Sequence, residues 1–231
     1  MRYKAAVAIL TLAWVGLPAL TNADVFPLTL DFEADGVGNP LEAGQIIDDE
    51  FAAFGIQVSA ENYAPGHPDL AIIFDSANPT GGDDDLATPN PAGHPSNTVP
   101  YDNILILAEN DIDLDGDGLI DNPDDEAHRP AGYLHFSLGG VYEAADFVFI
   151  DTEEAGGTVE FFLSGGSVGS VPIPAIPNAA VVPVSFSDAD FDAFQVNLAG
   201  SGGLCQFELV PEPSSLLLLI GGSVLCLSRR R

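Results

Sequence analysis

Basic residues are scarce in this sequence, and almost all of them lie at its two ends. Of 231 residues only 6 are Lys or Arg, against 35 Asp or Glu, and the formal net charge is −29. Residues 24–210 contain 34 acidic residues and a single basic one, Arg129. Nucleic acids and anionic lipid surfaces would repel such a segment. The composition therefore excludes nucleic acid as a partner and favours divalent cations.

Cysteine and tryptophan are nearly absent. With two cysteines, one of them in a terminal apolar stretch, the chain cannot form a disulfide framework. The single tryptophan, Trp14, lies in the N-terminal apolar run. If the protein binds a sugar, tyrosine is therefore the residue whose aromatic face would stack on the sugar ring and whose hydroxyl would form hydrogen bonds. Tyr63 and Tyr101, which lie in or beside expected loops, are the candidate ligand platforms.

The first 23 residues have the three zones of a secretory signal peptide: a positive start, an apolar run at 5–17, and small residues at 21–23. The 13-residue run spans about 20 Å, which is too short for a hydrocarbon core of roughly 30 Å. A buried helix or an uncleaved anchor are the alternatives. We expect cleavage after Ala23, which leaves residues 24–210 as one domain, long enough to bury a sizeable core.

The last 21 residues, 211–231, contain a Pro-Glu-Pro triplet, an apolar stretch at 214–228 and three arginines. Arginines that follow an apolar segment stay cytoplasmic, so residues 24–210 would lie on the outer side of the membrane. The apolar stretch spans about 22 Å, which suits a transient insertion. The residues that mark this second signal are Pro211, Glu212, Pro213, Arg229, Arg230 and Arg231.

This arrangement resembles the PEP-CTERM sorting signal of Gram-negative, biofilm-forming bacteria. The resemblance implies recognition by an exosortase, an intramembrane transpeptidase-like enzyme, with cleavage near the triplet. Short motifs at 31–33, 74–75, 80–90 and 200–202 also resemble those of secreted PEP-CTERM proteins, which are similar to lectin-like sandwiches.

Between the two signals, short β-type runs alternate with Gly, Pro, Asn and Asp. They predict an all-β fold, a β-sandwich of the jelly-roll type flanked by the two short hydrophobic helices of the signals. One helical turn is expected at 48–54, and the long connection 77–102 carries no expected strand. Strands are expected near 28–32, 56–60, 71–76, 103–109, 133–138, 146–151, 158–164, 170–173, 181–186, 193–198 and 204–210.

The irregular segment 110–131 carries the strongest chemical signal, because nine of the eighteen residues 109–126 are acidic. Alternate carboxylates let a curled loop direct every second side chain at one ion, and Gly118, sixth in the loop, permits the sharp turn. A solvated acidic loop is the alternative, and a register that begins at Asp111 fits the later positions less well. The predicted calcium ligands are Asp113, Asp115, Asp117, Leu119 through its carbonyl, Asp121 and Asp124.

This loop resembles the calcium loops of dockerins and thrombospondin type 3 repeats, in which Asp also takes the twelfth position. The resemblance implies calcium and no wider function. Asp83, Asp84 and Asp85 form a second candidate cation site, for which a solvated loop is the alternative. We expect Arg129 to pair with Asp124, Asp125 or Glu126.

One catalytic motif is formally present. Residues 165–169 match Gly-x-Ser-x-Gly, but no helix can follow them because of the prolines at 172 and 174, so we interpret them as a hairpin turn. Glycoside hydrolysis requires a pair of carboxyl groups at a defined separation. With so many acidic residues, the presence of two in the sequence does not indicate such a pair.

The leading hypothesis is an exported, non-enzymatic, calcium-binding protein of the cell surface or extracellular matrix. It would be inserted in the membrane by its C-terminal helix until an exosortase-type enzyme processes it, and calcium would bridge it to acidic polysaccharide. The alternative is a secreted carbohydrate-active hydrolase on a jelly-roll scaffold. A third hypothesis is a purely adhesive or matrix-structural protein with no small ligand.

Overall fold

The structure is a computed structural model that describes residues 26–212. These residues form ten β-strands and two short 3₁₀ helices. The expected signal peptide and the apolar stretch of the C-terminal signal lie outside the described residues. Within 26–212, no helix is both long and apolar enough to cross a membrane.

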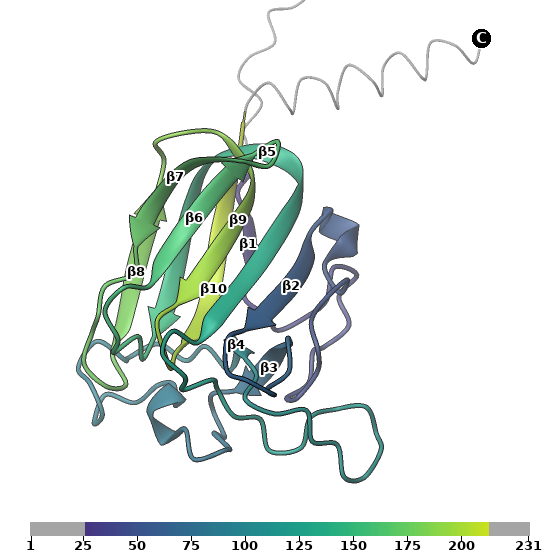
Figure 1. Cartoon of the computed structure of the whole chain (residues 1–231), viewed down its shortest axis with the longest axis vertical. Coiled ribbons are helices and arrows are strands. Elements are labelled where there is room, and N and C mark those ends of the chain that lie inside the picture. Colours follow the sequence, from purple (N-terminus) through teal and green to yellow (C-terminus); the bar gives the residue numbers. More distant parts are fainter. Residues whose placement is uncertain (1–25, 213–231) are drawn as a thin grey trace, which may run out of the picture.

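Strand β5 (Gly132–Ile150) organises the fold because it takes part in two layers (Figure 1). Its first part, 132–137, pairs with β2 (Gln57–Asn62) and β9 (Phe191–Leu198). Its second part, 145–150, pairs with β8 (Val181–Phe186) and β10 (Gly203–Pro211). The pairing shifts register between Ser137 and Tyr142, around Gly139 and Gly140.

The sequence predicted two strands here, at 133–138 and 146–151. That division is wrong, since one strand continues through both segments. The two glycines between these segments are typical of a turn. In the structure they lie where the strand bends from one layer into the other.

The remaining strands complete two antiparallel layers. The first layer has the order β2, β5, β9, β6 (Thr158–Leu163) and β7 (Gly166–Pro172). The second has the order β8, β5, β10, β4 (Asn103–Leu107) and β3 (Ala71–Asp75), with β1 (Leu28–Leu30) beside the later part of β10. From β5 onwards the chain passes repeatedly between the layers. This arrangement confirms the predicted all-β sandwich.

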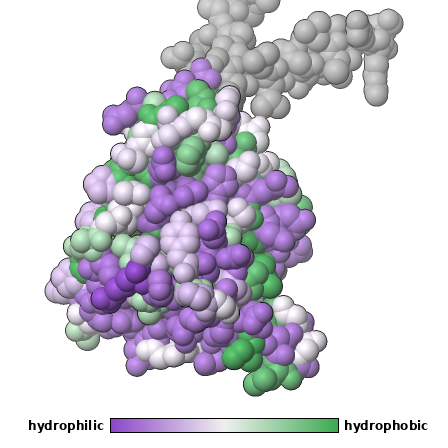
Figure 2. Space-filling view, viewed as in Figure 1, coloured by the Kyte–Doolittle hydropathy of each residue, from purple (hydrophilic) through white to green (hydrophobic). Residues whose placement is uncertain are grey.

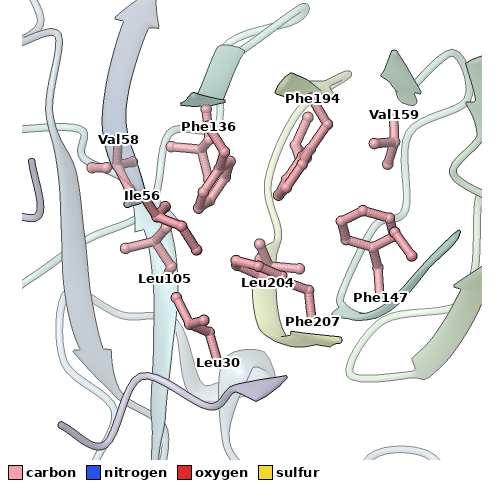
Figure 3. Packing of buried hydrophobic residues seen from close by; sticks show 14 of the residues in the cluster. Leu30, Ile56, Val58, Leu105, Phe136, Phe147, Val159, Phe194, Leu204 and Phe207 are labelled. Carbon is pink, nitrogen blue, oxygen red and sulfur yellow. The ribbon is translucent and has the colours of Figure 1, made fainter. Parts of the chain in front are cut away.

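Phenylalanine rings fill the space between the layers. Phe194 of β9 packs at centroid distances of 5.1 Å from Phe147 of β5 and 5.2 Å from Phe207 of β10. These rings are fully buried, and the burial of each contributes about 2 kcal/mol to stability. In Figure 3, Val58, Phe136, Phe194 and Val159 of the first layer face Leu105, Leu204, Phe207 and Phe147 of the second.

The second layer is also covered on its outer side, which explains why β3 and β4 are continuous apolar runs. Ile72 of β3 and Ile106 of β4 belong to a second hydrophobic cluster. The long connections also contribute to it, through Leu86 of the 3₁₀ helix η2 (Asp84–Leu86) and through Ile120. The long connections 77–102 and 108–131 are therefore packed against the sandwich. The helical turn expected at 48–54 is a shorter 3₁₀ helix, η1 (Ala52–Phe54).

The two ends of the sandwich carry different parts of the chain. Pro211, the first residue of the Pro-Glu-Pro triplet, is the last residue of β10 and pairs with Tyr142. The N–H of Glu212 donates to the carbonyl of Val141 at 3.1 Å. The long acidic connections lie at the opposite end (Figure 1), where most of the visible surface is hydrophilic (Figure 2). The C-terminal signal therefore leaves the sandwich at the end remote from the acidic loops.

Candidate functional site

The predicted calcium loop curls as its spacing suggests. Carboxylate oxygens of Asp113, Asp115 and Asp117 lie within 4.8 Å of one another. The N–H groups of Gly116 and Gly118 donate to the two carboxylate oxygens of Asp113, at 2.7 and 3.0 Å. All three aspartates are exposed to solvent. The structure thus brings together the first three predicted ligands on the surface of the loop.

The later predicted ligands, Asp121 and Asp124, lie in two different places. Asp121 closes the loop, since its Oδ2 accepts a hydrogen bond of 2.6 Å from the N–H of Leu114. The N–H of Leu119 donates to Oδ1 of Asp117 at 2.9 Å. Asp124, however, belongs to a different cluster. Ile120 is buried and donates to the carbonyl of Gly44 at 2.9 Å, so the chain is fixed to the sandwich before it reaches Asp124.

A second cluster consists of Asp83, Asp124 and Asp125, and we call it the carboxylate cluster. Oxygens of the three side chains also lie within 4.8 Å of one another. Asp83 comes from the connection 77–102, and Asp124 and Asp125 come from the connection 108–131. A bridge between Ala108 and Asp125 brings the second connection back beside the end of β4. The two acidic loops therefore meet at this cluster.

Further contacts fix the two loops at this meeting point. The hydroxyl of Thr80 donates to the carbonyl of Pro123 at 2.8 Å. Gly81 has a positive φ of 69°, and a Cβ there would lie 2.8 Å from the Cβ and Cγ of Asp124. Glycine at position 81 is therefore required for the close approach of the loops.

Asp125 is the buried member of the cluster. Its Oδ2 accepts hydrogen bonds from the N–H of Gly202, at 2.5 Å, and from the hydroxyl of Ser201, at 2.9 Å. The same hydroxyl lies 3.3 Å from Oδ2 of Asp151, another buried carboxylate. The turn between β9 and β10 thus holds Asp125 next to Asp151.

Burial disfavours the charged form of these carboxyl groups. It raises the pKa of Asp83 to about 8, and the charge of Asp125 adds to this effect. Burial also raises the pKa of Asp151 to about 7, and that of Asp125 to about 6 despite its hydrogen bonds. The pKa of Asp124 is raised for the same reason. The cluster therefore concentrates carboxyl groups whose ionisation is costly in the protein alone.

Arg129 does not form an ion pair with any carboxyl group of the cluster. It is the only Lys or Arg among residues 26–212, and it forms an ion pair with Glu154. The predicted pairing with Asp124, Asp125 or Glu126 is therefore wrong. Glu126 instead accepts hydrogen bonds from Asn62, at 2.8 Å, and interacts with a ring nitrogen of His67 at 2.6 Å.

The chemistry of both clusters suits a hard cation. Carboxylate oxygens are the ligands that calcium and magnesium prefer, and calcium accepts six to eight oxygen ligands in flexible geometry. A divalent cation in the carboxylate cluster would hold the carboxylates in their charged form and join the two loops. A third group, Asp48, Asp49 and Glu50, lies at the surface. There, Glu50 accepts a hydrogen bond of 2.8 Å from the N–H of Asp48.

The two candidate tyrosine platforms have different surroundings. Tyr63 is 44% exposed and lines a cavity of about 370 Å³. Tyr101 is partly buried against the second hydrophobic cluster, and this burial raises its pKa. Tyr63 is thus the platform that faces open space.

The Gly-x-Ser-x-Gly motif lies in a β-hairpin, as predicted. Leu163 of β6 pairs with Gly166 of β7, and Ser164 and Gly165 between them both have positive φ, as in a two-residue type I′ turn. The hydroxyl of Ser167 donates to Glu160 at 2.6 Å on the adjacent strand. A nucleophile elbow would need a helix after the serine, whereas here a strand follows.

The carboxylate cluster was only partly visible in the sequence. The run 83–85 suggested a second cation site, and Asp124 was assigned to the first. No spacing rule connects Asp83 with Asp125, because the contact depends on how two separate loops pack against the second layer.

Comparison with known proteins supports the C-terminal signal. Residues 209–231 match the PEP-CTERM protein-sorting motif. This confirms the signal predicted at 211–231. Such a motif implies sorting to the cell surface and processing by an exosortase. No curated protein matches the sequence of the chain.

Among solved structures, the lectin domain of lectinolysin complexed with Lewis B antigen is similar over 72% of this chain and 99% of its own, with 12% identity and a TM-score of 0.35. A fucose-binding module of Streptococcus pneumoniae is similar over 39% of this chain and 70% of its own, with 14% identity and a TM-score of 0.28. A carbohydrate-binding module of Cellvibrio mixtus lichenase 5A, in complex with cellotriose, covers 37% of this chain and 74% of its own, with 14% identity and a TM-score of 0.26. All three similarities are weak, and the fold described above rests on the strand pairing of the chain itself.

Proposed function

We propose that this chain is an exported, calcium-binding, non-enzymatic protein of the cell surface or extracellular matrix. The observation that carries the proposal is the carboxylate cluster, in which Asp83 and Asp125 from two long loops meet with raised pKa values. Calcium there would relieve the repulsion between the carboxylates and connect the loops. The loop that contains Asp113, Asp115 and Asp117 would hold a second, exposed ion.

The two ions would have different roles. The carboxylate cluster is partly buried, so its ion would stabilise the fold. The Asp113 loop is exposed, so water or a ligand could complete the coordination of its ion. We propose that carboxylates of an acidic polysaccharide bind there, because calcium would bridge two partners that otherwise repel each other. Extracellular calcium modules have dissociation constants of about 10⁻⁴ to 10⁻³ M, and we expect both sites to lie in this range.

The orientation of the sandwich fits a surface protein. The C-terminal signal leaves at one end, and the acidic loops lie at the other. While the C-terminal helix is inserted in the membrane, before exosortase processing, the acidic loops would point away from the membrane. After processing, the same end would face the extracellular matrix.

A binding role is preferred over hydrolysis because of where the acids lie. A glycoside hydrolase needs two carboxyl groups that flank a substrate, about 5–9.5 Å apart. In the carboxylate cluster the oxygens lie within 4.8 Å, and the backbone N–H of Asp125 bonds to Asp83. This arrangement leaves room for an ion rather than for a sugar ring.

Calcium titration of the purified protein by isothermal calorimetry tests the proposal. We expect binding with more than one ion per chain. The variant Asp125→Asn should lose the ion of the carboxylate cluster, and Asp113→Asn should lose the exposed ion. Asp188→Asn, an exposed position remote from both clusters, is the matched control. Absence of any calcium binding at millimolar concentrations would refute the proposal.

A further inference from the structure

A cavity of about 370 Å³ opens at the end of the first layer. Four segments meet there: the end of β2, the start of β5, the connection between β5 and β6, and the end of β9. Tyr63, Arg129, Glu154 and Asn197 contribute its polar and aromatic lining. The cavity is of the size that small-molecule sites have, and none of its lining residues belongs to the carboxylate cluster.

The backbone fixes Tyr63 at the rim of this cavity. Its N–H donates to the carbonyl of Ala131 at 2.8 Å, which ties the end of β2 to the start of β5. Its ring packs against that of Tyr133 at a centroid distance of 6.2 Å and an interplanar angle of 76°. Tyr133 is held in turn, because its hydroxyl donates to Glu61 at 2.8 Å. Tyr63 therefore presents an oriented aromatic ring that is still 44% exposed.

Glu154 and Arg129 form a neutral pair of hydrogen-bonding groups. The guanidinium of Arg129 pairs with Oε1 of Glu154, and the Arg129 side chain remains 67% exposed. The side chain of Glu154 is 11% exposed, and its Oε2 is buried without a hydrogen-bond partner among the described residues. A buried acceptor without a partner is costly, so the carboxylate still requires a donor. Glu154 is one of the residues that line the cavity, so its carboxylate is an acceptor beside any ligand bound there.

These groups select a particular kind of ligand. The aromatic ring offers an apolar face, Arg129 offers donors, and the carboxylate of Glu154 offers an acceptor. Asn197 lies beside them, with its amide nitrogen 3.1 Å from the hydroxyl of Thr158 and its oxygen bonded to Gln195 at 2.7 Å. A ring with adjacent hydroxyl groups matches this set, because each hydroxyl both donates and accepts. An anionic ligand matches it less well, because Glu154 already neutralises Arg129.

We propose that this cavity binds an uncharged sugar residue, with its ring against Tyr63 and two adjacent hydroxyls on Arg129 and Glu154. The inference rests on the proposed role in polysaccharide binding and adds a second site to it, one that needs no calcium. The calcium-dependent site on the Asp113 loop would bind acidic polysaccharide, whereas the cavity would bind neutral chains.

Binding of oligosaccharides to the purified protein tests the inference. The probes are neutral gluco-, galacto- and manno-oligosaccharides and oligouronates, each measured with calcium and with a chelator. We expect at least one neutral probe to bind in both conditions, and Tyr63→Ala to weaken its binding at least tenfold. Tyr63→Phe should retain most of the affinity, and Glu154→Gln should reduce it. Phe54→Ala, which removes a ring that is 42% exposed at another place, is the matched control and should have no effect.

The possible failures are distinguishable. If neutral probes bind equally to the Tyr63→Ala variant, the cavity is not the site, although polysaccharide binding stands. If only oligouronates bind, and only with calcium, the inference is overturned while the calcium bridge is supported. If no probe binds to protein that still binds calcium, both the inference and the proposed polysaccharide role fail, and the calcium role remains.

Discussion

The backbone N–H of Asp125 donates a hydrogen bond of 3.0 Å to Oδ2 of Asp83, a residue 42 positions earlier in the chain. This contact joins the connections 77–102 and 108–131, and it places the carboxyl groups of both residues in one cluster. Because the carboxylates of this cluster repel one another when they are ionised, a cation bound there would stabilise the fold.

The stability of the calcium-free protein should decrease as pH rises from about 4 to about 8. An unfolded aspartate titrates near 3.8, whereas the folded pKa values of Asp125 and Asp83 are about 6 and about 8. Between these limits the folded state binds more protons than the unfolded state, so raising the pH favours unfolding. Urea denaturation with a chelator at several pH values measures this.

The variant Asp83→Asn supplies the control for the pH series. Since it removes a carboxyl group whose pKa burial raises to about 8, the decrease in stability between pH 6 and pH 8 should become shallower. An unchanged slope in this variant would show that Asp83 does not cause the effect.

The variant Asp125→Asn should remove most of the stabilisation by calcium. The asparagine oxygen can still accept the hydrogen bonds from Ser201 and Gly202, so the calcium-free variant should be about as stable as the calcium-free parent. Urea midpoints with calcium and with chelator measure the response. A variant that responds to calcium like the parent contradicts the assignment of Asp125 as a ligand.

The variant Ile120→Ala should loosen the acidic loop. Ile120 is buried in the second hydrophobic cluster, and truncation of such a side chain costs about 2–5 kcal/mol when the site cannot collapse. Because Ile120 fixes the loop to the sandwich, limited proteolysis should cleave residues 111–119 faster in the variant. Calcium should slow that cleavage in the parent. Equal cleavage with and without calcium would mean that no ion orders the loop.

Replacement of the Pro-Glu-Pro triplet by Ala-Ala-Ala should block processing without unfolding the sandwich. Pro211 ends β10, and the core residues of that strand, Leu204, Phe207 and Leu209, precede it. The variant should keep the thermal unfolding temperature of the parent and accumulate as a longer form, which mass spectrometry of exported protein detects. Normal processing of the variant would contradict the role of the triplet.

The sequence predicted the strands well and the site in part, for different physical reasons. Strand positions follow from the local pattern of apolar and polar residues, so the strand at 181–186 lies where the sequence predicted it. The contacts of Asp113 with Gly116 and Gly118 also follow from short-range spacing. By contrast, Asp83 meets Asp125, and Arg129 meets Glu154, only through packing of distant segments. Local sequence patterns do not predict such tertiary contacts.

Thermal unfolding of the purified protein with calcium and with chelator tests the central claim most directly. At a hundredfold excess over the dissociation constant, binding of one ion should contribute about 2.7 kcal/mol. For a chain of this size the unfolding temperature should then rise by roughly 5–10 °C, and most of this rise should be lost in Asp125→Asn. The same unfolding temperature in chelator and in about 10 mM calcium would contradict the account.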